Sequence, residues 1–118
     1  MTGAQMIARE RTRQREKEGW TAEHDNGHRN DELAMAAAVY ALPARVRTET
    51  IFGRQLRHIL WPWDARYWKP SPDRIHELVK AGALIAAEID RLQRAISTTE
   101  ERPGLMGPKY REGVPWKE

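Results

Sequence analysis

Two histidines with acidic neighbours form the first group of residues that could do chemistry. His24 and Asp25 are adjacent, and His28 and Glu32 follow at intervals of four residues. Imidazole and carboxylate groups bind divalent metals and act as general acids and bases. The Asn26-Gly27 pair predicts a turn, which would separate the two imidazoles. We therefore interpret the segment as a hydrogen-bonded loop in which His24 and Asp25 hold backbone groups, with a metal site as the alternative.

The second group is an aromatic loop over residues 61–72, which contains Trp61-Pro62-Trp63 and Trp68-Lys69-Pro70. Indole rings can stack on planar ligands such as nucleobases, and nearby Arg and Lys side chains can pair with phosphate. The alternative is that Trp61 and Trp63 fill the core of a domain that has only one Phe. The predicted ligand-binding residues are Trp20, His24, Asp25, His28, Arg29, Trp63, Arg66, Trp68 and Lys69.

Other charged groups carry weaker signals. We interpret Glu77, Glu88 and Asp90 as solvated residues of a charged helix face. Glu77 and Glu88 share a face but lie about three turns apart, and Asp90 points elsewhere, so the carboxylates cannot meet. The arginines between positions 9 and 15 alternate with other residues and make no basic stripe, so nucleic-acid binding is not expected. A glycine-rich phosphate loop and a Ser-His-Asp set are absent from the sequence. No catalytic set, metal site or cofactor is predicted.

Composition limits the class of protein. The chain has 118 residues, of which 40% are hydrophobic and 31% charged, and its formal net charge is +3. It has no cysteine, which excludes disulfides, cysteine zinc sites and thiol nucleophiles. No apolar run approaches the roughly 20 residues of a membrane span, and the N-terminus does not read as a secretory signal. We expect a small cytoplasmic protein with no membrane contact.

Hydrophobic spacing predicts an all-α fold. Helices are expected over 4–18, 32–41 and 73–96, with loops over 20–30 and 61–72. Residues 44–60 suit either a short amphipathic helix or a flexible insertion. The predicted architecture is a small helical bundle over 1–96, with a Trp/Pro-rich loop and an extended or disordered tail over 97–118.

The helix at 73–96 has the clearest pattern. Its seam recurs in steps of three and four over three heptads, a spacing typical of helices that pack along their length. We expect this seam to pack against the second helix, against a second copy of the chain, or against both. Packing against a second copy would form the homo-oligomer that we expect. The seam residues are Ile75, Leu78, Gly82, Ile85, Ile89, Leu92 and Ile96.

The order of these motifs along the chain carries a resemblance. The motifs are Gly19-Trp20-Thr21, Glu23-His24-Asp25, His28, Glu32-Leu33, Ala36-Ala37-Ala38, Trp61-Pro62-Trp63, Trp68-Lys69-Pro70 and the helix from Leu78 to Leu92. Over about residues 7 to 94 the chain resembles a family of short proteins of tailed phages and prophages, which brings no activity with it. It is more faintly similar to helical phage proteins related to MazG-type nucleotide pyrophosphohydrolases, but it lacks their metal-binding acidic motif.

The resemblance and the loop composition together imply a phage-type accessory protein that acts by binding. We expect it to bind and sequester a nucleotide-like ligand without turnover, and a signalling nucleotide of host defence is one candidate. One alternative is a metal-dependent nucleotide phosphohydrolase that uses His24, Asp25, His28 and Glu32. Another is a protein–protein inhibitor of a host factor, which would make contact through the charged first helix or the tail around Trp116.

Overall fold

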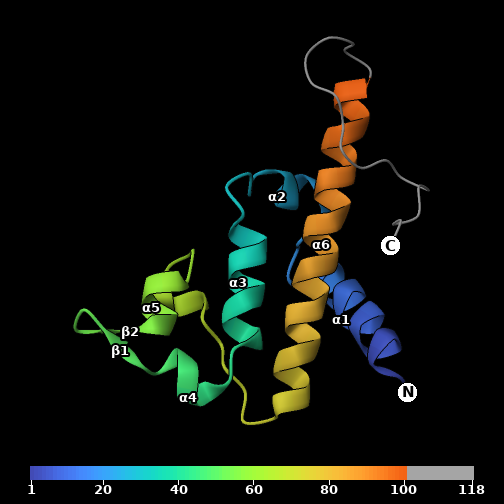
Figure 1. Ribbon diagram of the computed structural model, residues 1–118. Helices are drawn as coiled ribbons and strands as arrows, with labels where there is room; N and C mark the ends of the chain where they lie inside the picture. The colour runs from blue at the N-terminus through green and yellow to red at the C-terminus, as the bar shows by residue number, and fades with distance from the viewer. Residues whose placement is uncertain (101–118) are drawn as a thin grey trace, which may run out of the picture.

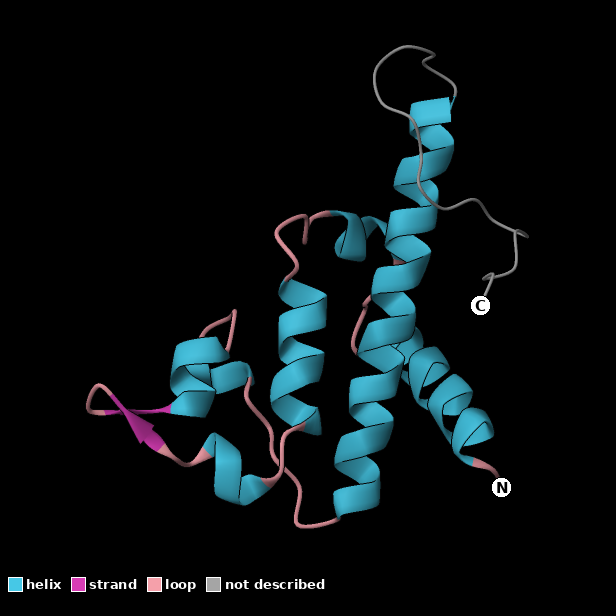
Figure 2. Ribbon diagram, in the orientation of Figure 1, coloured by secondary structure: helices cyan, strands magenta, loops and turns pink. Residues whose placement is uncertain are grey.

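The fold is built almost wholly from helices, as predicted (Figures 1 and 2). A computed structural model describes residues 1–100, and the tail around Trp116 lies outside the described residues. The described elements are α1 (Gly3–Lys17), α2 (Ala22–Asn26), α3 (Glu32–Ala41), α4 (Ala44–Arg47), β1 (Thr50–Ile51), β2 (Arg54–Gln55), α5 (Leu56–Leu60), a 3-10 helix (Ala65–Tyr67) and α6 (Arg74–Glu100). None of the helices in this part of the chain is long and apolar enough to span a membrane.

The long helix α6 is the centre of the fold, because both α3 and α1 pack against it (Figure 1). The core lies between α3 and α6. Small side chains dominate it, so the two helix backbones can approach closely, and half-buried tryptophans pack around it. The buried core residues are Leu33, Ala36, Ala37, Tyr40, Ala81, Leu84 and Ala87.

The face of α6 that enters the core is not the predicted seam. The second helix packs against the face that carries Ala81, Leu84 and Ala87. Five large seam side chains remain 44–59% exposed, from Ile75 at 59% to Leu92 at 44%. The expectation that the seam packs against the second helix is therefore wrong. The alanine-rich face was hidden in the sequence, because small side chains contribute little to a pattern of large apolar residues.

Two carboxylates of α6 are buried, which contradicts their interpretation as a solvated face. Glu88 is 6% exposed and Glu77 is 3% exposed. An Oε2 atom of Glu77 lies 2.6 Å from the Arg47 guanidinium, and Arg74 contacts the other oxygen at 3.4 Å. Both arginines also donate to backbone carbonyls of residues 40–42, at the end of α3. These carbonyls have no partner within their own helix, so the arginines satisfy them and Glu77 holds the arginines in place.

Residues 44–60 fold into two short helices and a hairpin instead of one continuous helix. The hairpin pairs Thr50 with Gln55 and Ile51 with Arg54. Its two turn residues, Phe52 and Gly53, have φ angles of 54° and 78°. Two consecutive positive φ angles match the turn that suits the natural twist of a hairpin, and a glycine meets that demand without steric cost.

The segment between α1 and α3 is more ordered than the predicted loop. Gly19, with φ of 73°, ends α1 as expected. The side chain of Thr21 then accepts a hydrogen bond from the His24 amide and starts the one-turn helix α2. Asp31 precedes α3 with φ of 63°, but its side chain makes no capping hydrogen bond. The chain therefore reverses over a single helical turn, which fixes the positions of His24 and His28.

Candidate functional site

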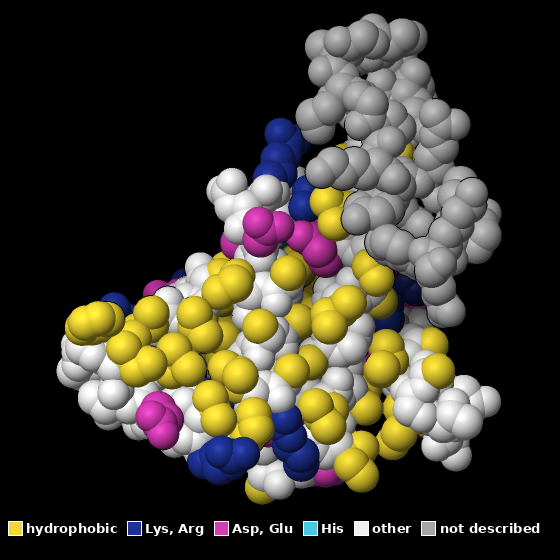
Figure 3. Space-filling model, viewed as in Figure 1, with side chains coloured by type: hydrophobic (Ala, Val, Ile, Leu, Met, Phe, Trp, Pro, Cys, Tyr) yellow, Lys and Arg dark blue, Asp and Glu magenta, His cyan; other side chains and the backbone are white. Residues whose placement is uncertain are grey.

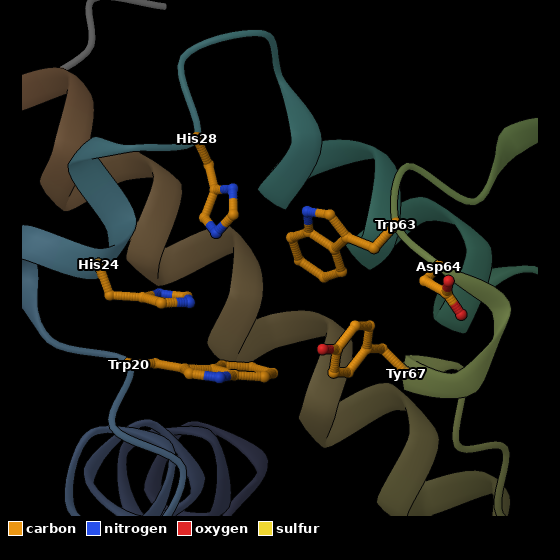
Figure 4. Close-up of a pocket in the computed structure, with 6 residues that line it drawn as sticks. All are labelled: Trp20, His24, His28, Trp63, Asp64 and Tyr67. Carbon is orange, nitrogen blue, oxygen red and sulfur yellow. The ribbon is translucent and has the colours of Figure 1, made fainter.

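A pocket of about 380 Å³ opens between the α1–α2 region and the loop that precedes α6 (Figure 4). Its lining is mostly aromatic, with one carboxylate. The residues come from the α1–α2 connection, α2, the α2–α3 connection, and the loop after α5 with its 3-10 helix. They are Trp20, His24, His28, Trp63, Asp64 and Tyr67.

Three rings on one side of the pocket are spaced four residues apart. The rings of Trp20 and His24 are parallel to within 3°, with centroids 5.9 Å apart. The ring of His28 meets that of His24 edge-on at 4.8 Å. The expectation that a turn at Asn26-Gly27 would separate the histidines is wrong. His24 lies within the single turn of α2, and Trp20 before this turn and His28 after it line the same pocket.

Trp63 closes the opposite side. Its ring centroid lies 5.1 Å from that of His28 and 6.5 Å from that of Trp20. The indole Nε1 of Trp63 is buried and has no hydrogen-bond partner among the described residues. Figure 4 shows this nitrogen on the side of the ring that faces His28. A buried donor without a partner is unfavourable, so this N–H can donate to an acceptor that enters the pocket.

A carboxylate orients each histidine. The Nδ1 atom of His24 lies 3.1 Å from Oδ1 of Asp25, and the Nδ1 atom of His28 lies 3.1 Å from Oε2 of Glu32. When a carboxylate engages Nδ1, the Nε2 atom remains available to a ligand. The arrangement holds both imidazoles in fixed orientations at the edge of the pocket.

Asp25 acts from behind the pocket wall. Its side chain is fully buried, and its Oδ2 atom lies 2.9 Å from the guanidinium of Arg11. It was predicted among the ligand-binding residues, but it does not line the pocket. Its carboxylate instead joins α1 to α2 and orients His24, so Asp25 is a positioning residue.

Glu32 has an altered acidity that fits its role. Burial alone would raise the pKa of its carboxyl group. Hydrogen bonds from the Asn30 amide and from His28 outweigh burial and hold the pKa of Glu32 below its ordinary value. The carboxylate is thus charged at neutral pH and keeps His28 in place.

The predicted stacking residue Trp68 lies elsewhere. Its ring packs 4.7 Å from that of Tyr40 and 5.1 Å from that of Trp61, against the α3–α6 core. The guanidinium of Arg47 covers it at 5.2 Å. Trp68 is therefore half-buried against the core and does not line the pocket.

The three predicted phosphate ligands are not gathered at the pocket. Arg29 lines a separate hollow with Arg91 and Arg94. The backbone amide of Lys69 donates to the Tyr40 hydroxyl, outside the pocket lining. Arg66 lies 4.9 Å above the ring of Tyr67 and so contacts one member of the lining.

Two pocket residues were missed in the sequence. Asp64 directly follows Trp63, and Tyr67 comes one 3-10 turn later. The Asp64 side chain accepts a hydrogen bond from the Arg66 amide and starts that turn, which brings the Tyr67 ring to the pocket. Their position in the aromatic loop could have indicated them, because Asp64 directly follows Trp63 and Tyr67 directly precedes Trp68.

Metal ligation has no support from the arrangement of side chains. Within residues 1–100, no group of three or more His, Cys, Asp or Glu residues is placed to hold a metal ion. Two of the four residues in the predicted alternative, Asp25 and Glu32, are engaged with Nδ1 atoms of the histidines.

Comparison with known proteins gives no relative from which a function could be carried over. The chain matches no family model, no curated protein and no solved structure.

Proposed function

We propose that this protein binds a nucleotide-like ligand and sequesters it without chemical turnover, with the base held in the aromatic pocket. The observation that carries the proposal is the convergence of Trp20, His24, His28 and Trp63 around one open cavity of about 380 Å³. That volume falls within the range of small-molecule sites, about 300–1,000 Å³. Aromatic walls with a few polar groups suit a planar, heteroatom-rich ring.

The polar groups of the lining suit a base or a sugar. The Asp64 carboxylate can accept hydrogen bonds from exocyclic amines or ribose hydroxyls. The unpaired Nε1–H of Trp63 can donate to a ring nitrogen or a carbonyl. The Nε2 atoms of the two histidines can do either, according to their protonation.

Phosphate groups of the ligand would lie at the rim. Arg66 stacks on Tyr67 and its side chain is 73% exposed, so its guanidinium can reach an anion outside the aromatic walls. Its Nε atom lies 3.9 Å from the Asp64 carboxylate. We assign Arg66 to phosphate in this proposal because its guanidinium stacks on the lining residue Tyr67, whereas Arg29 lines a separate hollow and Lys69 is outside the lining.

The proposal includes homo-oligomerisation through α6 and a cytoplasmic, phage-type accessory role. A stoichiometry follows from the geometry. All six lining residues belong to one chain, so each copy in an oligomer would carry one complete pocket.

Tryptophan fluorescence and calorimetry test the proposal. The purified protein is titrated with a panel of nucleoside monophosphates, triphosphates and cyclic dinucleotides. We expect saturable binding of at least one member at one ligand per chain, with a change in emission from Trp20 and Trp63. His24→Ala should weaken binding at least tenfold, whereas the matched control Arg29→Ala should leave it unchanged.

The bound nucleotide must also be recovered intact. After incubation with Mg²⁺, Mn²⁺ or Zn²⁺, mass spectrometry should find only the added nucleotide. Metal-dependent hydrolysis that His28→Ala abolishes would overturn sequestration in favour of the phosphohydrolase. Absence of binding across the panel at millimolar ligand would refute nucleotide recognition altogether.

A further inference from the structure

The solvent-facing side of α6 carries a stripe of large apolar side chains. Leu78, Ile85, Ile89 and Leu92 are between 44% and 51% exposed, and Ile75 is 59% exposed. They make up five of the ten large hydrophobic residues with exposed side chains among the described residues. Figure 3 shows hydrophobic side chains at the surface of α6 and of the neighbouring helices α3 and α5. We call the set of residues Ile75, Leu78, Ile85, Ile89 and Leu92 the α6 stripe.

The α6 stripe contains no charged residue, and several charged side chains of this helix make contacts on its other faces. Lys80 lies 4.7 Å above the Tyr40 ring, and Arg91 is buried with Glu88. Asp90 points toward Arg11 of α1 at 4.0 Å. A nucleic acid or an acidic peptide would find no cation on the stripe. The surface that complements it must be apolar and about as long.

Gly82 does not belong to this surface. A Cβ atom at position 82 would lie 2.5 Å from Cδ1 of Ile7, so α1 already occupies the space in front of this glycine. The glycine of the predicted seam is therefore explained by packing within one chain. The large residues of the seam remain 44–59% exposed.

We propose that a second copy of this chain covers the α6 stripe and that the two α6 helices pair along it. The spacing of three and four residues is the pattern by which identical helices pack side chains into each other's gaps. From Ile75 to Leu92 the stripe spans 17 residues, or about 25 Å at 1.5 Å per residue. A copy of the same helix offers the same length, the same spacing and no charge.

The exposed area of the α6 stripe indicates the size of the interface that two copies could form. About half of each stripe side chain, on the order of 80 Å², is exposed, so one copy presents on the order of 400 Å². Two copies together with flanking residues bury on the order of 1,000 Å², which is the lower limit for a specific interface. An interface at this lower limit is typical of a weak, reversible dimer. This inference specifies the homo-oligomerisation included in the proposed function. It rests on the exposed face of α6 and not on the ligand pocket, so pairing and ligand binding can fail separately.

Sedimentation velocity on the ligand-free full chain tests the pairing. The wild-type protein should pass from monomer to dimer as the concentration rises through the micromolar range. Ile85→Glu should raise the dissociation constant at least tenfold. Phe52→Glu is the matched control, because Phe52 is 98% exposed at the hairpin turn and lies outside the stripe. Circular dichroism of both variants checks that the helices are intact.

A cysteine experiment covers the case in which Ile85→Glu fails to fold. The chain has no cysteine, so a single Ile85→Cys substitution supplies the only thiol. Ile85 lies near the middle of the predicted seam, so it faces its own copy in parallel and antiparallel pairs alike. Oxidation should link Ile85→Cys at least ten times faster than Phe52→Cys.

Three results would overturn the pairing. The first is a monomer at every concentration, with no faster cross-linking at position 85. The second is a dimer that Ile85→Glu leaves intact, which would place the interface elsewhere. The third is a monomer whose stripe side chains are protected from hydroxyl-radical labelling, which would assign the stripe to another segment of the same chain.

Discussion

Replacement of Asp25 by Asn tests whether the buried carboxylate behind the pocket holds α1 and α2 together. The Asp25 side chain is fully buried and Arg11 is only 9% exposed. Besides Asp25, Arg11 has the Trp20 carbonyl at 3.3 Å and Asp90 at 4.0 Å, and its Nε atom has no hydrogen-bond partner. Asp25→Asn keeps the shape but leaves a buried cation that lacks its charge partner.

The magnitude follows from the burial of both groups. Removal of one partner from a buried ion pair costs about 3–5 kcal/mol. Asp90 is half exposed and 4.0 Å away, so it can offset at most about 1 kcal/mol. We expect a loss of about 3 kcal/mol in the free energy of unfolding. At about 4–8 °C per kcal/mol for a domain of this size, the melting temperature should fall by roughly 12–24 °C.

Urea and thermal unfolding, followed by the helical circular dichroism signal, measure this loss. Asp90→Asn is the matched control and should cost less than about 1 kcal/mol, because its pair with Arg11 is exposed and long. The double variant Arg11→Met, Asp25→Leu should recover much of the loss, since it removes both charges from the interior. A loss below about 1 kcal/mol in Asp25→Asn would refute the reasoning, because it would mean that Arg11 is effectively hydrated.

Two further predictions concern α6. Hydrogen bonds from Arg47, the Ser71 amide and Arg74 outweigh burial and hold the pKa of Glu77 below its ordinary value. The charged Glu77 therefore stabilises the fold above the unfolded pKa of about 4.3, and this stabilisation is lost as pH falls through the lower folded pKa. Unfolding free energies from pH 7 to pH 3 should therefore fall less steeply for Glu77→Gln than for the wild type, and equal slopes would contradict the assignment. Gly82→Ala should stabilise the helix by about 1 kcal/mol in an Ile7→Ala background, where the space is free, but not in the wild type, where Cδ1 of Ile7 lies 2.5 Å from the new Cβ. A double-mutant cycle measured by urea unfolding gives the coupling, and equal effects in the two backgrounds would argue against the contact.

The sequence predicted the main helices well because their signals are local. The helix predicted over 32–41 coincides with α3. The one predicted over 73–96 begins at Arg74 and continues to Glu100, so residues 97–100 are helical and not part of an extended tail. Capping residues, prolines and the apolar period fix such boundaries. The interior was predicted less well. The burial of Glu77 depends on Arg47, which lies 30 residues away along the chain, and no local pattern reports such a partner.

The candidate site shows the same division between local and long-range information. Trp20, His24, His28 and Trp63 were identified by residue type, and they do line one pocket. Trp68 has the same chemistry and a similar neighbourhood in the sequence, yet it packs against Tyr40 in the core. Which tryptophan faces the core depends on the path of the loop between α5 and α6. That path is set by tertiary contacts such as the hydrogen bond from the Lys69 amide to the Tyr40 hydroxyl.

The one-turn helix α2 explains why adjacent residues in this segment have opposite roles. Successive residues of a helix point about 100° apart, so His24 can line the pocket while Asp25 points into the interior toward Arg11. The contact between His24 Nδ1 and the Asp25 carboxylate then joins the pocket wall to the buried ion pair. Stability and binding should therefore separate by residue. His24→Ala removes a ring from the pocket wall but leaves the buried ion pair intact, so it should weaken ligand binding with little change in unfolding free energy. Asp25→Asn should lower both, because it releases the helix that presents the ring.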